Sequence, residues 1–264
     1  MLPIIQIEFI TIRTPTIALL LGLWFGLDIA SRFGARRGLN VDRMYSLGFW
    51  AALAGLLAAR LSFVAVHLDT YLKITPWYQA LESVFALTSG TEIAPVGILA
   101  ALAVAWLLIR RWRLPILVTL DSYSPGLAAL GISIGVAALL GGDMYGVASD
   151  LPWAIDLWGG PRQPTQIYFT LACVAILVIL WQVERRRGRS LPPGTIAQWF
   201  AALMGLTLLL VEPLRADSPV IFGSIRLLEV VGLAGIIAAM VGFAIRAPTE
   251  PEEVGGEAEP DRAV

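Results

Sequence analysis

The sequence predicts an all-α integral membrane protein with seven transmembrane helices, its N-terminus outside and its C-terminus in the cytoplasm. Of the 264 residues, 57% are hydrophobic and only 15% are charged. The mean hydropathy of +0.75 lies well above the range of soluble domains. The apolar residues form seven separate runs, and helices are forced there because unpaired backbone amides are not tolerated in hydrocarbon.

Residues 1–14 precede the first run and alternate loosely between polar and apolar side chains. This segment is shorter than the ~20 residues that a spanning helix needs, so we expect an extended or amphipathic segment on the outer surface. The predicted membrane domain covers residues 15–246. Its apolar runs occupy residues 15–31, 46–66, 95–109, 121–140, 166–183, 195–211 and 227–245. Residues 247–264 are acidic, rich in proline and without periodicity, which predicts a disordered cytoplasmic tail.

The orientation follows from the basic residues at the ends of the runs. Twelve arginines follow the odd-numbered runs, whereas five basic residues lie on the opposite side. The first group is Arg32, Arg36, Arg37, Arg43, Arg110, Arg111, Arg113, Arg185, Arg186, Arg187, Arg189 and Arg246; the second is Arg13, Lys73, Arg162, Arg215 and Arg226. Basic residues favour the cytoplasmic side. We interpret the inner arginines as topology determinants and sites for anionic lipid.

A polar segment from residue 141 to residue 168 interrupts the apolar pattern and marks a candidate site. It contains Asp143, Gly146, Arg162, Gln166 and Tyr168. Polar groups at this depth cost solvation energy and usually serve a function. The glycine has two possible roles, either close helix packing or close backbone approach to a ligand.

Further polar residues are expected at the same outer surface: Arg60 and His67 around the second run, Glu212 and Arg215 after the sixth, and Arg226 before the seventh. Arginine suits phosphate because its planar fork donates two parallel hydrogen bonds. A phospholipid headgroup is the nearest abundant phosphate, so anionic phospholipid is the expected ligand.

Each of these assignments has a structural alternative. Arg60 could form an intramembrane ion pair with Glu212 or Glu229. Arg215 and Arg226 could be interface anchors, and His67 could be a proton acceptor or a polar interface residue.

Other kinds of site find no support in the sequence. Cys173 is the only cysteine, so no internal disulfide can form. One histidine and no metal-ligand spacing argue against a metal, and no phosphate-binding loop or dinucleotide motif suggests a cofactor or nucleic acid.

Four short motifs resemble the prolipoprotein diacylglyceryl transferases of bacterial membranes, a family with seven spans. They are Ala59-Arg-Leu-Ser-Phe-Val64 followed by His67 and Tyr71, Gly142-Asp-Met-Tyr-Gly146, Arg162-Gln-Pro-Thr-Gln-Ile-Tyr168 and Val211-Glu-Pro-Leu-Arg215. Two family motifs are absent. Ala94-Pro-Val-Gly97 stands where the family has His-Gly-Gly, and Ile134-Gly-Val-Ala-Ala138 replaces a segment with an arginine and an asparagine.

The resemblance implies lipoprotein biosynthesis at the bacterial plasma membrane. The family transfers a diacylglyceryl group from phosphatidylglycerol to a lipobox cysteine of a preprolipoprotein, and glycerol phosphate leaves. It gives Arg215 a catalytic or phosphate-binding role and Arg60 a structural or binding role, while Asp143, Gly146, Gln166 and Tyr168 would shape the pocket. Two hypotheses follow. Either His67 and Arg226 replace the missing groups in a transferase, or the chain is a catalytically silent relative that binds phospholipid or lipoprotein.

Overall fold

The computed structural model describes residues 4–7, 10–73, 94–187 and 191–246. Seven long helices are α1 (Thr14–Arg36), α2 (Val41–Val66), α5 (Ala94–Arg111), α6 (Ile116–Gly141), α7 (Thr165–Arg187), α8 (Thr195–Val211) and α9 (Leu227–Arg246). Two short ones are α3 (Leu68–Leu72) and the 3₁₀ turn η3 (Glu212–Leu214). The strands are β1 (Ile4–Ile7), β2 (Ile10–Arg13), β3 (Ile155–Leu157), β4 (Gly160–Arg162), β5 (Val220–Phe222) and β6 (Ile225–Arg226).

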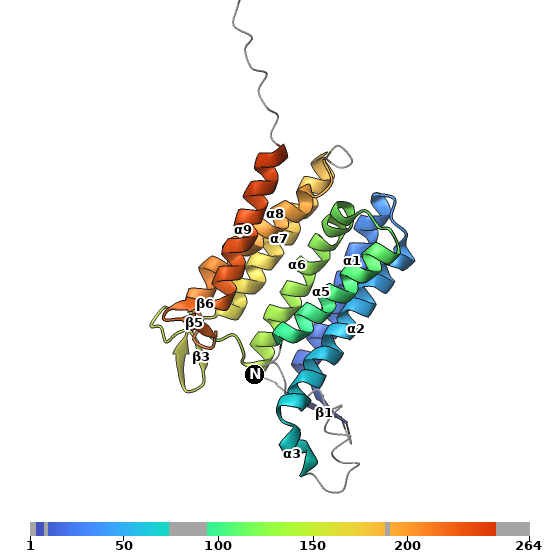
Figure 1. Ribbon diagram of the computed structural model, residues 1–264. Coiled ribbons are helices and arrows are strands. Elements are labelled where there is room, and N and C mark those ends of the chain that lie inside the picture. The colour runs from blue at the N-terminus through green and yellow to red at the C-terminus, as the bar shows by residue number, and fades with distance from the viewer. Residues whose placement is uncertain (1–3, 8–9, 74–93, 188–190, 247–264) are drawn as a thin grey trace, which may run out of the picture.

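The mostly helical architecture agrees with the predicted class of an all-α membrane protein. Six helices are long and apolar enough to cross a membrane: α1, α2, α6, α7, α8 and α9. The remaining predicted span corresponds to α5, which has 18 residues and is not among these six. The long helices run side by side as a bundle (Figure 1). The prediction that the chain spans the membrane seven times, and the predicted orientation of these spans, therefore stay predictions.

Several helices extend further than the apolar runs suggested. α1 continues five residues beyond the predicted end at residue 31, to Arg36, and α6 begins at Ile116, before Asp121. α7 continues past residue 183 to Arg187. In α1 and α7 the added turns are polar, and some of their side chains have partners, such as Arg32 with Asp28 and Glu184 with Arg37. These two helices therefore do not end where the apolar run ends.

Glycine pairs let three pairs of helices approach closely. The pairs are Gly26 with Gly126 in α1 and α6, Gly55 with Gly97 in α2 and α5, and Gly205 with Gly232 in α8 and α9. A Cβ atom built on Gly26 would lie 2.8 Å from the carbonyl oxygen of Gly126, and one on Gly232 would lie 2.8 Å from that of Gly205. Small residues of this kind are the usual interface of membrane helices, because packing replaces the hydrophobic effect there.

α6 is the central helix of the bundle. It packs against α1 on one side and against α7 and α8 on the other, while α2 pairs with α5 and α8 with α9. Half of its apolar window is buried, the largest share among the six candidate spans. The lone thiol of Cys173 is fully buried in the core beside Phe169 and Val211. α6 therefore connects the first helices of the chain to the last three.

Three antiparallel hairpins add the β-structure: β1–β2, β3–β4 and β5–β6. In the first, Ile4 pairs with Arg13. This agrees with an extended N-terminal segment, whose place on the outer surface is still a prediction. β3, β5 and β6 lie at the end of the bundle opposite the α1–α2 turn (Figure 1). The predicted tail at 247–264 lies outside the described residues.

Candidate functional site

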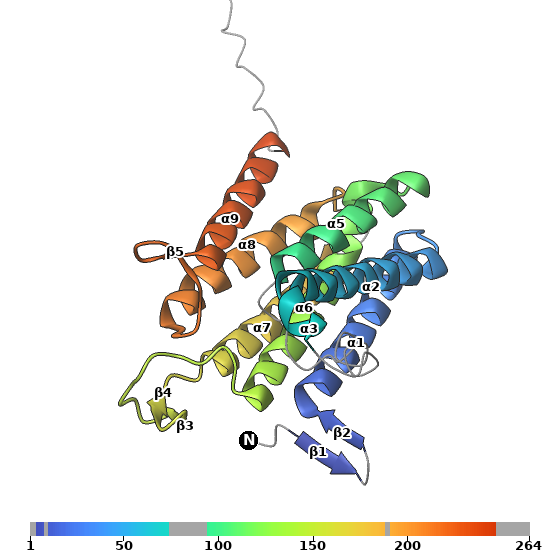
Figure 2. The ribbon, with the colours of Figure 1, turned by 60° about the horizontal axis from the view of Figure 1, so that its bottom comes forward.

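Isolated bridges and main-chain hydrogen bonds connect three segments of the chain near the β3–β4 and β5–β6 hairpins. Figure 2 shows β3, β4 and β5 on the same side of the bundle. Gly146, just after α6, forms a bridge with Arg215, just after η3. The backbone N–H of Val147 donates to the carbonyl of Leu214 at 2.9 Å, and that of Gln163 donates to Val147 at 3.0 Å. The polar segment and the loop after α8 are thereby held together, as expected from the sequence for Gly146 and Arg215.

Arg215 lies at the centre of an ion cluster whose other members are the buried Glu212 and the exposed Asp217. Its Nη1 donates to Oε1 of Glu212 at 2.5 Å, and its Nε donates to Oδ1 of Asp217 at 3.1 Å. Only 9% of Arg215 and 2% of Glu212 are exposed. The second oxygen of Asp217 accepts the backbone N–H of Met144 at 2.7 Å. We name Glu212, Arg215 and Asp217 the Arg215 cluster. Two carboxylates face the guanidinium of Arg215, so the positive charge of Arg215 is compensated.

Three buried polar atoms at this end have no hydrogen-bond partner among the described residues. They are Oε1 of Gln166, Oε2 of Glu212 and Oγ of Ser218. Gln166 is fully buried, and its Nε2 donates to the main-chain oxygen of Asp143 at 2.8 Å. A buried polar group without a partner costs about 1–3 kcal/mol. These atoms therefore favour a ligand that brings hydrogen-bond donors.

Arg226 keeps more donors available than Arg215 does. Its Nη1 contacts the carbonyl oxygen of Ser218 at 3.5 Å, and its backbone N–H donates to Glu229 at 3.1 Å. No other hydrogen bond of its guanidinium occurs within the described ranges. Arg215 and Arg226 thus contact neighbouring residues of one loop, Asp217 and Ser218, which supports the predicted meeting of these two arginines.

Arg162 is engaged mainly by its own hairpin. Its Nε donates to the carbonyl oxygen of Leu157 at 3.1 Å, and its Nη1 lies 3.4 Å from that of Gly146. The guanidinium carbon also lies 5.1 Å from the centre of the Tyr145 ring. A cavity of about 350 Å³ lies beside it, lined also by Asp150. These contacts support a role in holding the hairpin more strongly than a role in phosphate binding.

The other predicted residues of the polar segment contribute packing and main-chain groups. A Cβ atom on Gly146 would lie 2.7 Å from the Cβ of Gln163, so close packing alone requires a glycine there. Asp143 is exposed and reaches Gln166 through its main-chain oxygen. The hydroxyl of Tyr168 accepts the indole N–H of Trp153 at 2.6 Å.

Arg60 and His67 form a second group at the end of α2. Nη2 of Arg60 donates to the hydroxyl of Tyr71 at 3.2 Å. Nδ1 of His67 lies 2.9 Å from the carbonyl oxygen of Phe63. A carbonyl can only accept, so Nδ1 is the donor in this contact, and in the neutral ring Nε2 then has a lone pair. This group lies at the same end as the hairpins (Figure 1).

The two carboxylates considered as partners of Arg60 are engaged elsewhere. Glu212 pairs with Arg215, and Glu229 accepts the backbone N–H of Arg226. Among the described residues, no hydrogen bond or ion pair joins His67 to the Arg215 cluster, so their predicted convergence has no direct contact to support it.

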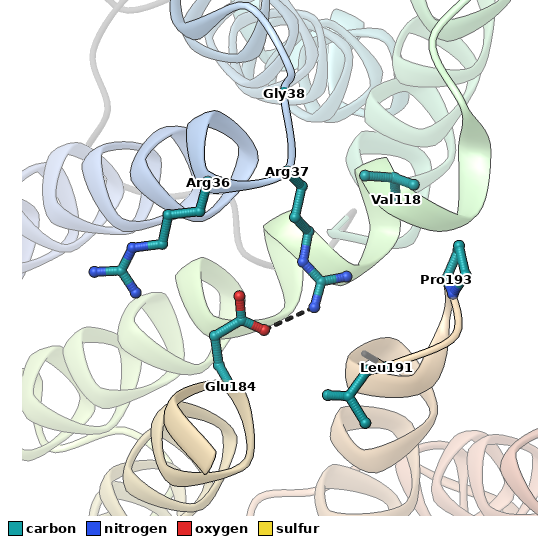
Figure 3. Close-up of a pocket in the computed structure, with 7 residues that line it drawn as sticks. All are labelled: Arg36, Arg37, Gly38, Val118, Glu184, Leu191 and Pro193. Carbon is teal, nitrogen blue, oxygen red and sulfur yellow. Dashed lines mark hydrogen bonds and ion pairs between the residues drawn. The ribbon is translucent and has the colours of Figure 1, made fainter. Parts of the chain in front are cut away.

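A second ion cluster, which was not predicted from the sequence, lies at the opposite end of the bundle. Arg37 donates through Nη1 to Asp121 at 2.6 Å and through Nη2 to Glu184 at 2.7 Å. Figure 3 shows Arg37 and Glu184 at a cavity of about 360 Å³. Burial by itself lowers the pKa of Arg37, but the hydrogen bond to Glu184 and the charges of both carboxylates outweigh it and hold that pKa above its usual value.

The interpretation of the inner arginines as topology determinants and lipid sites stays a prediction; for Arg37 the structure adds a pairing with two carboxylates. A carboxylate within an apolar run, as at Asp121, was the signal that could have revealed this cluster, because a buried acid needs a partner.

The fold and the site define an integral membrane protein with arginine–carboxylate clusters at both ends of its helices. The family model of the prolipoprotein diacylglyceryl transferases matches residues 3–245, so the chain belongs to this family of transferases.

Relatives named phosphatidylglycerol–prolipoprotein diacylglyceryl transferase cover most of the chain. The protein of Finegoldia magna is 28% identical over 226 residues, 85% of this chain and 87% of the relative. That of Gloeobacter violaceus is 28% identical over 251 residues, 91% and 90% of the two chains. That of Thermosynechococcus vestitus is 26% identical over 251 residues, 90% of each.

Proposed function

We propose that the chain transfers a diacylglyceryl group from phosphatidylglycerol to the lipobox cysteine of a preprolipoprotein. The observation that carries this proposal is the Arg215 cluster, which lies beside a second arginine, Arg226, and beside acceptors that have no partner among the described residues. This arrangement offers guanidinium donors for a phosphate and acceptors for hydroxyl or thiol groups. The names of the relatives support the same reaction.

In this reaction the cysteine sulfur attacks the glycerol carbon that carries the phosphate, forming a C–S bond. The C–O bond to the phosphate breaks, its electron pair stays on the departing glycerol phosphate, and the thiol proton goes to a base. Donors placed where the phosphate charge develops lower the barrier. We assign this role to both arginines: Arg226 contributes its free N–H groups, and Arg215 contributes its guanidinium charge and fixes the loop.

Two groups can accept the thiol proton. His67 is the only histidine of the chain, and the Nε2 of its neutral ring can accept a proton. Glu212 has a buried oxygen, Oε2, without a partner among the described residues. We propose His67 as the base and Glu212 as the alternative, because Oε1 of Glu212 is already committed to Arg215.

The proposal includes seven spans, with the Arg215 cluster at the outer leaflet of the bacterial plasma membrane. The asymmetry of basic residues supports this orientation. Phosphatidylglycerol or another anionic phospholipid and the lipobox peptide would then enter from the same side.

Cysteine labelling tests the orientation. A cysteine at Ser224, exposed in the β5–β6 turn, should react in intact cells with an impermeant thiol reagent, whereas one at Pro192, exposed before α8, should be shielded. The native Cys173 is fully buried and supplies no background. The opposite pattern would place the Arg215 cluster in the cytoplasm and exclude the proposed topology.

A catalytically silent binder of phospholipid or lipoprotein is the second candidate function. Compensation of Arg215 by two carboxylates favours it, as does the segment at residues 94–97 in place of His-Gly-Gly. Complementation decides between the two: the chain is expressed in cells depleted of their own transferase, and lipoprotein is analysed by mass spectrometry. Diacylglyceryl-modified lipoprotein is the expected result, and retention of phospholipid without modification would identify the silent binder.

A further inference from the structure

We propose that the Arg37 cluster, made of Arg37, Asp121 and Glu184, positions the Arg215 cluster from the far end of the bundle. It fixes α7 and α8 against α6, and these two helices carry Gln166 and Glu212 to the site. Asp121 and Glu184 are thus positioning residues, which rests on the Arg215 cluster being the functional site.

Asp121 caps the N-terminus of α8 from another helix. The N-cap residue of α8 is Gly194, which has no side chain to accept the first N–H groups. Asp121, fully buried on α6, accepts the N–H of Gly194 at 2.6 Å and that of Ala197 at 2.8 Å. A carboxylate there satisfies orphan donors and complements the positive end of the helix dipole. The start of α8 is therefore fixed to α6.

Gly194 is matched to this contact by its backbone. Its φ is +92°, in the left-handed region that favours glycine. A Cβ atom there would also lie 3.2 Å from a side-chain carbon of Leu117, near the start of α6. Position 194 therefore lacks a side chain that could cap its own helix, and Asp121 supplies the cap instead.

Glu184 fixes α7 in the same way through Arg37. It is 8% exposed near the end of α7 and accepts from Nη2 of Arg37, whose Nη1 holds Asp121. One guanidinium, from the turn between α1 and α2, therefore connects α6 with α7. Figure 3 shows Arg37 directed toward Glu184 across the cavity between these elements.

The opposite ends of the same helices carry the site. α7 begins with Thr165 and Gln166, and α8 leads directly into Glu212 and Arg215. A helix of α8's length spans about 26 Å and transmits an axial shift at one end to the other. At the site, Gln166 is held by the Asp143 main chain and Arg215 by the strand bridge to Gly146. Each helix is thus fixed at both ends, which sets its position along the bundle axis and its rotation about its own axis.

The test measures helix positions by spin-label distances in the purified full chain, without turnover. The distance between labels on Ile134 of α6 and Leu210 of α8 gives the position of α8 relative to α6. The distance between labels on Ile134 and Ile167 of α7 gives the position of α7 relative to α6. All three positions are exposed, with 38%, 63% and 37% of the residue accessible. These distances can be interpreted even if the protein shows no transfer activity. The positioning proposal and the proposed transferase function can therefore be rejected independently of each other.

Asp121→Ala is expected to shift or broaden the α6–α8 distance by about 1.5 Å, the rise of one helical residue. Glu184→Ala should change the α6–α7 distance and leave α6–α8 as in the parent. Asp121→Asn keeps one acceptor oxygen and should restore part of the α6–α8 distance. Because Asp121 also accepts from Arg37, Asp121→Ala should change the α6–α7 distance too. Movement of both distances in Glu184→Ala would instead indicate a general loss of structure.

Arg32→Ala is the matched control, because Arg32 pairs with Asp28 at 2.7 Å within α1, and none of the described contacts of this ion pair reaches α6, α7 or α8. It should leave both distances unchanged. A parental α6–α7 distance in folded Glu184→Ala protein would overturn the proposal, as would an equal shift in the control. If Asp121→Ala does not fold, Glu184→Ala still decides it.

Discussion

Replacing Arg215 by alanine is expected to lower transfer by about 10²–10³-fold, the usual cost of removing a donor that stabilises developing charge. It should also reduce the anionic phospholipid that copurifies with the protein, since each charge-assisted contact contributes about 1.5–3 kcal/mol. Arg186→Ala, at an exposed arginine near the end of α7, is the matched control and should change neither quantity. Transfer is measured with a lipobox peptide, and bound lipid by mass spectrometry.

A structural effect of this substitution has to be separated from a functional one. Arg215→Ala leaves the buried carboxylate of Glu212 without its cation, which typically costs about 3–5 kcal/mol of stability. The double variant Arg215→Gln and Glu212→Gln removes both charges and should recover thermal stability while transfer stays low. Recovery of transfer together with stability would show that Arg215 acts only through folding, and the phosphate-binding role would be rejected.

The second large effect is expected at His67. If Nε2 of His67 accepts the thiol proton, His67→Ala should lower transfer by about 10²–10⁴-fold, the usual contribution of a general base. Its Nδ1 bond to the carbonyl of Phe63 is local to the end of α2, so the fold should tolerate the substitution. Single-turnover transfer to a lipobox peptide is the measurement, with lipid retention expected to stay at the parental level.

Glu212→Gln is the companion variant, because it keeps shape but removes the proton-accepting charge. Transfer that survives in His67→Ala and disappears in Glu212→Gln would show that the carboxylate of Glu212 accepts the thiol proton. The role of His67 would then be refuted. Full activity in both variants would mean that the thiol is activated by neither group.

The sequence by itself determined the class of the protein and most of its helical organisation. Apolar runs of the right length predict helices because the backbone must satisfy its own hydrogen bonds in lipid. Their boundaries were less certain: α1 and α7 extend into polar residues that hydropathy excludes, and α6 begins five residues before the predicted run. Short motifs around Gly146 and Arg215 also indicated the family, which the match over residues 3–245 confirms.

The tertiary structure alone decided how each charge is used. Arg37 and Arg215 look alike in sequence to other arginines of the chain, yet each lies between two carboxylates. Arg226, by contrast, keeps free N–H groups among the described contacts. The pairing of Arg37 depends on which helices lie side by side. The glycine contacts that determine this arrangement join residues far apart in the sequence. Local sequence therefore predicts that an arginine is present near the surface, whereas the fold decides whether it holds the helices together or remains available to a ligand.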